Sequence, residues 1–342
     1  MKHETKMKQI GVIGYGYWGP NLSRVWSQNR RARLKYVCDL KEDRMSAARI
    51  NCPHSTITKD YFDILKDPEV TAVNIATNII THFQIAKDAL LHDKHVLVEK
   101  PLSASSEEVI ELTKLAAERN RILMVGHTFL YSPPVIQVQK LLKSGSVGNV
   151  DFIQLTRINL GKVKHDFNVI WDLAPHDFSI LEYWLEEEPI WIQVVGKASV
   201  YQNVCDVAFI NMHYPGDILA NVQLSWLSPV KLRSSYIVGD KQMITYDDTH
   251  PSEKIKVYDM GVDLVREPDT FGEFQLTYRS GDIHVPRVDN KEPLMEECEH
   301  FLDCIEKNQP PKTGPKHALR IVRMIEAAQE SLKNSGERVY LK

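Results

Sequence analysis

The chain has 342 residues, of which 43% are hydrophobic and 25% charged, a composition that indicates a folded protein and excludes a largely disordered one. Its 42 Lys and Arg residues against 45 Asp and Glu residues leave a net charge of −3, which gives no electrostatic case for a nucleic-acid or membrane partner. This length favours two domains over one.

Short apolar runs alternate with segments of helical period over the first 128 residues. The predicted strands are residues 9–13, 34–38, 55–58, 72–76, 95–98 and 122–125. The predicted helices between them are residues 17–28, 42–50, 61–65, 79–91 and 106–120. Six strands interleaved with helices predict an α/β fold with a doubly wound parallel sheet, a Rossmann domain over residues 1–128.

The pattern changes after Gly126. The predicted helices are now residues 134–144, 174–185, 293–307 and 317–335. The predicted strands are residues 150–158, 192–195, 208–213, 220–226, 234–238 and 243–246. Because tight turns connect consecutive strands, residues 129–342 are predicted to form an α+β domain around a large, mostly antiparallel sheet.

A glycine-rich turn follows the first predicted strand, with Gly14, Gly16 and Gly19 in the spacing GxGxxG. In a strand–turn–helix unit these glycines permit a tight turn, close approach of a pyrophosphate and close helix packing. The turn, with Tyr17 and Trp18 inside it, is predicted to bind a dinucleotide at the helix N-terminus.

Asp39 ends the second predicted strand, 20 residues after Gly19, where the dinucleotide fingerprint needs an acidic group for the ribose hydroxyls. A carboxylate there repels a 2′-phosphate, so NAD is predicted in preference to NADP. Lys41 and Arg44 lie close in sequence and weaken this preference.

Glu99, Lys100 and Pro101 follow the fifth predicted strand, at the edge of the sheet where ligands bind in open α/β folds. A lysine there can take or relay the proton of a hydroxyl group as hydride leaves the carbon. The alternative is a surface lysine before a turn, and without the fold context it is the better interpretation.

Asp172 and His176 stand one turn apart if residues 171–177 are helical, which places a carboxylate beside an imidazole. Pro175 indicates that the helix begins here, with the proline in its first turn. Taken alone, the pair fits a structural role better than a catalytic one.

These three motifs occur in an order that resembles the Gfo/Idh/MocA oxidoreductases, a family named for glucose–fructose oxidoreductase and inositol dehydrogenase. The resemblance covers nearly the whole chain. It implies that the second domain carries an open-faced sheet through which members form homodimers or homotetramers. One departure concerns Asn78, because members often have proline at or near this position.

The resemblance also implies roles for individual residues. Lys100 would be the catalytic or proton-relay lysine, Pro101 would follow a cis peptide, and Glu99 would lie against the nicotinamide ribose. Asp172 and His176 would bind the substrate hydroxyls, with His176 as the acid/base. The loop after the fourth strand would border the cofactor through Thr77 and His82.

The substrate is less defined. The stretches 126–133, 278–283 and 292–302 look similar to members encoded with nucleotide-sugar pathways, so the resemblance favours a ring hydroxyl of a nucleotide-linked sugar and adds Tyr131 to the substrate site. A polar segment precedes Trp171, which could offer an apolar face to a sugar ring; the segment is equally consistent with a solvated loop. Its polar residues are Arg157, Asn159, Lys162, Lys164, His165 and Asn168.

Two alternatives remain open: an inositol or free-sugar dehydrogenase, and a non-catalytic NAD(H)-binding regulator. No metal site is predicted, since none of the 13 histidines forms an HxH or HExxH pattern. The five cysteines form no CxxC pair, and no signal peptide or membrane-length apolar stretch is found. We therefore expect a cytoplasmic enzyme with reduced thiols.

Overall fold

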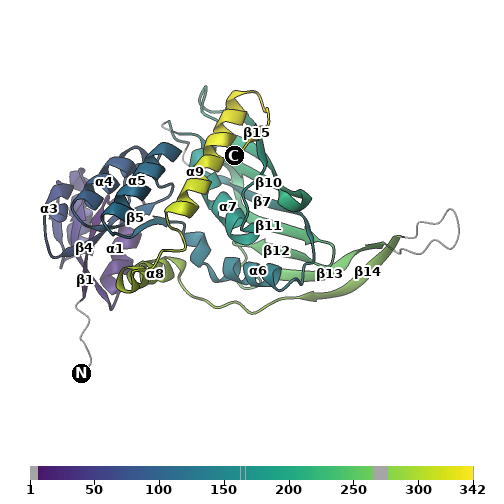
Figure 1. The fold of residues 1–342 in the computed structure, drawn as a ribbon, viewed down its shortest axis with the longest axis horizontal. Helices are drawn as coiled ribbons and strands as arrows, with labels where there is room; N and C mark the ends of the chain where they lie inside the picture. The colour runs from purple at the N-terminus through teal and green to yellow at the C-terminus, as the bar shows by residue number, and fades with distance from the viewer. Residues whose placement is uncertain (1–6, 162, 166, 265–275, 342) are drawn as a thin grey trace. The chain divides into compact units, whose positions relative to one another are not determined.

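The computed structural model describes residues 7–161, 163–165, 167–264 and 276–341 (Figure 1). Lys162, part of the polar segment noted above, lies outside these residues. The chain divides into two compact units: Met1–Tyr131 with Lys291–Arg323, and Ser132–Asn290 with Met324–Lys342. The predicted boundary at residue 128 assigned the whole C-terminal part to the second domain, whereas the contacts group residues 291–323 with the first.

The first unit contains a six-stranded parallel sheet in the order β3-β2-β1-β4-β5-β6, and this confirms the predicted Rossmann fold. The central strands are buried on both faces, as all-parallel sheets require. The strands are β1 Lys8–Ile13, β2 Ala32–Cys38, β3 Thr56–Thr58, β4 Val70–Ile75, β5 His95–Glu99 and β6 Leu123–Gly126.

Side-chain caps mark where several helices of this unit begin. The Asp60 carboxylate accepts from the Phe62 N–H, and the Ser105 hydroxyl accepts from the Glu108 N–H at 3.3 Å. The helices are α1 Gly19–Gln28, α2 Glu42–Asn51, α3 Tyr61–Leu65, α4 Ile79–Leu91, α5 Ser106–Glu118, the 3₁₀ turn η1 Thr128–Tyr131 and α8 Pro293–Lys307.

The returning C-terminal segment joins the first unit through specific contacts. The Val125 N–H donates to the Thr313 carbonyl oxygen at 2.9 Å, so residue 313 covers part of the edge strand β6. Arg31 pairs with Glu299 and Asp303 on α8. These contacts explain why residues 291–323 belong with the Rossmann sheet, and no sequence pattern indicates them.

The second unit contains a nine-stranded, mostly antiparallel sheet in the order β14-β13-β12-β11-β7-β10-β9-β8-β15, as predicted for an α+β domain. Only β10 and β7 pair in parallel within this sheet, among the pairs of described strands. The strands are β7 Val150–Leu160, β8 Trp191–Lys197, β9 Val207–Tyr214, β10 Ile218–Ser225, β11 Leu227–Gly239, β12 Met243–Asp247, β13 Ile255–Leu264, β14 Leu276–His284 and β15 Val339–Tyr340.

Helices cover one face of this sheet: α7 packs on β7, β9 and β10, and α6 packs on β12. The other face carries partly exposed apolar side chains, which makes the sheet open-faced. The helical elements are α6 Pro133–Lys143, α7 Val169–Leu185, the 3₁₀ turn η2 Pro215–Asp217 and α9 Pro315–Lys333, which runs from residues of the first unit into the second.

Helix α7 begins earlier than its sequence pattern predicts. Asn168 caps it, because its side-chain oxygen accepts from the Ile170 and Trp171 N–H groups at 3.1 and 3.3 Å. Pro175 consequently lies inside the helix, so the prediction that it marks the first turn is wrong. In the described part of the chain, no helix is both long and apolar enough to span a bilayer.

Candidate active site

The glycine turn joins β1 to α1 in a conformation that needs two of its glycines. Gly14 has φ +99°, and a Cβ there would lie 2.6 Å from the Ala76 carbonyl oxygen. A Cβ at Gly19 would collide with the carbonyl oxygen of Gly14. Sterics within the chain therefore account for both residues.

Gly16 is different, because a Cβ there would meet only the Arg44 guanidinium group at an ordinary 3.5 Å. Packing within the chain does not exclude a side chain at this position, so a close ligand explains the glycine better. No side chain caps the adjoining N-terminus of α1, whose first N–H groups suit a phosphate. Tyr17 is 89% exposed and stands edge-on to Trp18, which is half-buried.

Asp39 follows β2, and backbone donors fix its carboxylate. The Tyr15 N–H donates to Oδ2 at 2.7 Å and the Lys41 N–H donates to Oδ1 at 2.9 Å. The Arg44 guanidinium group lies 3.3 Å from Oδ2. A carboxylate has about four acceptor positions, so Asp39 can still accept ribose hydroxyls, as the predicted cofactor site requires.

The loop after β4 is held by hydrogen bonds of His82 and Asn78. His82 is 1% exposed, and its Nδ1 and Nε2 lie 2.9 and 3.2 Å from the carbonyl oxygens of Pro101 and Thr77. These contacts let His82 hold the loop in place, and its predicted role beside the cofactor stays a prediction. Asn78 caps α4 by accepting from the Ile80 N–H, which explains a non-proline residue there.

Glu99 and Lys100 lie at the carboxyl end of β5, on the same sheet edge as the glycine turn and Asp39. Lys100 is half-buried, and its peptide bond to Pro101 is cis, as the family resemblance implies. Glu99 is 8% exposed, and burial raises the pKa of its carboxyl group to about 7, although the charge of Lys100 opposes this.

In the second unit, Asp172 lies in the first turn of α7 and His176 lies one turn further along. The Lys164 ammonium group donates to Asp172 Oδ1 at 2.8 Å, and the Trp226 indole N–H donates to Oδ2 at 3.2 Å. These donors fix the carboxylate. No sequence pattern indicates this contact of Trp226, because the residue follows β10 more than 50 residues downstream and only tertiary packing brings it to α7.

Two residues predicted to contact substrate are buried and have partners within the chain. Arg157 is 4% exposed, and its Nε and Nη2 donate to Asp177 at 2.8 and 2.9 Å. Tyr131 is 5% exposed, and its hydroxyl lies 3.2 Å from that of Thr313. These contacts give both polar groups a structural role, and their contact with substrate stays a prediction.

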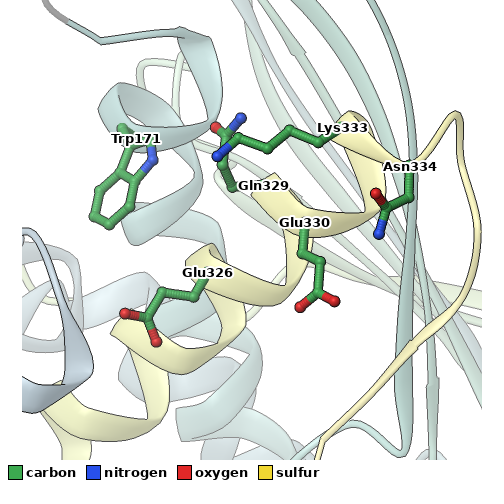
Figure 2. Close-up of a pocket in the computed structure, with 6 residues that line it drawn as sticks. All are labelled: Trp171, Glu326, Gln329, Glu330, Lys333 and Asn334. Carbon is green, nitrogen blue, oxygen red and sulfur yellow. The ribbon is translucent and has the colours of Figure 1, made fainter.

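Trp171 is half-buried and lines an open pocket of about 330 Å³ between α7 and the last turns of α9 (Figure 2). Asp172 and His176 are not among its lining residues, so this pocket does not join Trp171 to the Asp–His pair. The other lining residues are Glu326, Gln329, Glu330, Lys333 and Asn334.

A Rossmann unit with a dinucleotide-type turn, followed by a unit built on an open-faced sheet, defines a class of two-domain oxidoreductases. Residues 8–127 match the profile of the oxidoreductase family's NAD-binding Rossmann fold, and residues 140–341 match that of its C-terminal alpha/beta domain. The chain therefore belongs to the Gfo/Idh/MocA oxidoreductase family, as its motifs indicate.

Characterised relatives include dehydrogenases of two kinds. The chain is 29% identical to UDP-N-acetylglucosamine 3-dehydrogenase of Acidithiobacillus ferrooxidans over 64% of this chain and 66% of that protein. It is 24% identical to myo-inositol 2-dehydrogenase of Thermotoga maritima over 95% and 96%. Its fold is similar to the NAD complex of GenD2 from gentamicin A biosynthesis, with a TM-score of 0.83, 20% identity, and coverage of 99% and 98%.

Proposed function

We propose that this oxidoreductase is NAD-dependent and transfers hydride between the nicotinamide and a ring hydroxyl or ketone of a nucleotide-linked sugar. One observation carries the proposal: Lys100 directly follows β5, at the same sheet edge as the glycine turn and Asp39. The open space at Gly16 and the uncapped α1 N-terminus fit a dinucleotide diphosphate.

The preference for NAD rests on the negative charge of Asp39, which disfavours a 2′-phosphate. The Arg44 guanidinium group, 3.3 Å from Asp39 Oδ2, offsets part of this charge. We therefore expect discrimination against NADP to be real but incomplete.

NAD, which the glycine turn and Asp39 would hold, would supply the acceptor for the hydride that leaves the carbinol carbon. The Lys100 amine takes the hydroxyl proton in this direction and returns it when the ketone is reduced. Asp172, fixed by Lys164 and Trp226, accepts hydrogen bonds from substrate hydroxyls, and His176 serves as a second acid/base group.

The nucleotide-sugar assignment draws on the UDP-N-acetylglucosamine 3-dehydrogenase relative. A second candidate, oxidation of inositol or a free sugar, is favoured by the inositol dehydrogenase relative, which aligns over 95% of this chain. The two differ in whether a nucleotide is needed for substrate binding.

We also propose that the chain forms a homodimer or homotetramer through the open face of its second sheet. Phe152 pairs with Leu219 across β7 and β10, and both side chains are exposed, by 43% and 51%. Phe209 and Tyr236 project from the same face. In Phe152→Lys, the molar mass measured by light scattering should fall to that of the monomer.

The five free, buried cysteines are consistent with a reducing cytoplasm.

The test is NADH formation during incubation with NAD and a panel of nucleotide sugars, free sugars and inositols. Lys100→Ala and His176→Ala should each lower kcat at least about 100-fold, the lower range of general acid–base effects, while NAD binding persists. Lys114→Ala, on the exposed face of α5, is the control. Near-normal turnover in both variants would contradict the assigned roles. NAD binding without turnover of any substrate would favour the regulator.

A further inference from the structure

A group of polar, titratable side chains is buried in the first unit, and two of them, Glu99 and His127, interact electrostatically with Lys100. Glu297 of α8 is 0% exposed, His127 is 1% exposed and Glu99 is 8% exposed. Buried polar groups without full hydrogen bonding are costly, and a fold that keeps several together has a reason for them. The proton transfer proposed above uses none of these three side chains.

Glu297 lacks the partners that a buried carboxylate needs. Its Oε2 accepts from the Thr128 hydroxyl at 3.0 Å, while its Oε1 has no hydrogen-bond partner among the described residues. Burial and, to a lesser extent, the negative charge of Glu99 raise the pKa of Glu297 well above its ordinary value. A fully buried carboxyl group with a single hydrogen-bond donor among the described residues favours its protonated, neutral form.

Glu99 has an environment that tolerates a charge better. The Lys100 backbone N–H bonds its carboxyl group, and the positive charge of Lys100 favours ionisation. Gly126, its partner across β5 and β6, borders the carboxyl group, since a Cβ there would lie 3.4 Å from Glu99 Cδ and Oε1. The pKa of Glu99, raised by burial to about 7, still lies in the range where a small change in pH alters its charge.

The titratable neighbours add little competing charge. Tyr131 of η1 and Cys298 of α8 interact with Glu297, and burial raises the pKa of both well above their ordinary values, so both are neutral. Burial holds the pKa of His127 well below its ordinary value, and His127 stands edge-on to His317 of α9 at 4.9 Å. The positive charge beside the pair comes from Lys100.

We propose that Glu99 and Glu297 form a buried carboxyl pair that ionises only at Glu99, because Glu297 keeps its proton, and that Glu297 thereby acts as a positioning residue for Lys100. A charged Glu99 stabilises the ammonium form of Lys100, and a neutral Glu99 favours the amine. The pair thus controls how readily Lys100 takes or gives the substrate proton, and this part of the inference rests on the proposed function.

Infrared spectra recorded at a series of pH values test the pair without substrate. Wild type should show one protonated-carboxyl C=O band that persists above pH 7 and a second that is lost as the pH rises through about 7. Glu297→Gln keeps an acceptor for Thr128 and should remove only the persistent band. Glu99→Gln should remove only the titrating band, and Glu296→Gln, a partly exposed neighbour on α8, should remove neither. The inference is overturned if the persistent band survives in Glu297→Gln. If that variant fails to fold, the inference is overturned if Glu99→Gln loses the persistent band.

The pH dependence of kcat/KM, which reports the free enzyme, tests the link to Lys100. Glu297→Ala opens a polar space that water can fill, which should favour the ionised form of Glu99. The limb of the kcat/KM pH profile that reports Glu99 should therefore move to lower pH by on the order of one unit. In Glu297→Gln, this limb should return to its wild-type pH. A merely structural role of Glu297 would not produce this return. A limb unmoved by Glu297→Ala and Glu99→Gln overturns the positioning role. If no substrate turns over, the proposed function fails, while the infrared bands still decide on the pair.

Discussion

The buried Arg157–Asp177 pair gives the sharpest test of whether Arg157 is structural or binds substrate. Asp177→Ala removes the carboxylate that pairs with the Arg157 side chain, which is 5% exposed. Breaking such a pair from one side costs about 3–5 kcal/mol, because an uncompensated charge stays buried. Against a total stability of about 5–15 kcal/mol, this loss is large.

Urea unfolding followed by tryptophan fluorescence measures the effect. Four of the six tryptophans (at 171, 184, 191 and 226) lie in the second unit, so the signal reports mainly on the unit that holds the pair. Asp151→Ala, an exposed aspartate on the same strand as Arg157, controls for loss of charge alone and should change the free energy of unfolding by about 0.5 kcal/mol or less.

The double variant Arg157→Met with Asp177→Leu should recover most of the lost stability, because an apolar pair of similar size avoids the buried charge. If Arg157 binds substrate instead, Arg157→Met raises KM while Asp177→Ala unfolds near the wild-type midpoint. That combination of results would refute the structural interpretation.

Three further variants follow from the first unit. His95→Asn removes an imidazole group whose pKa burial lowers to about 4. Because the unfolded chain binds this proton near pH 6.5, wild type should lose stability as the pH falls from about 6.5 to 4. The variant should lose less stability over this range, and Tm measured against pH tests this. Gly14→Ala puts a methyl group 2.6 Å from a carbonyl oxygen at φ +99° and should abolish NAD binding in calorimetry, while Gly145→Ala, at φ +71° in open space, controls for backbone strain. Asp39→Asn should lower the ratio of the NADP dissociation constant to the NAD dissociation constant about tenfold, which corresponds to about 1.4 kcal/mol of binding free energy. Asp43→Asn on α2 should leave this ratio unchanged.

The Rossmann unit was predictable because its signals are local. Continuous apolar strands, helical periods and a glycine turn at the right offset each depend on neighbours in sequence. The position of Glu99 and Lys100 at the sheet edge follows from the same alternation. What could not be predicted is that residues 291–323 pack on this unit, because long-range hydrogen bonds such as that from Val125 to Thr313 leave no mark in sequence.

The second unit was less predictable where its elements are only partly buried. Strands β13 and β14 form a long paired ribbon whose described side chains are mostly half-buried or exposed, so they do not show a clean period of two, and neither strand was predicted (Figure 1). The first turn of α7 was missed for another reason. Pro175 looks like a helix start, whereas the cap at Asn168 places it in the second turn, where it lacks an N–H to donate to the preceding turn.

Glu297 shows which signal could have been used. It lies three residues after Leu294 and four before Phe301, both buried, so it occupies the apolar stripe of α8. The acidic residues on either side, Glu296 and Glu299, point away from the stripe and are partly exposed. A carboxyl group on an apolar stripe is either neutral or matched by a buried cation. The spacing of Glu297 in the sequence therefore marks it as a candidate for a special role. Here the charged neighbour is Glu99, an acid and not a cation, which favours the neutral form proposed for Glu297.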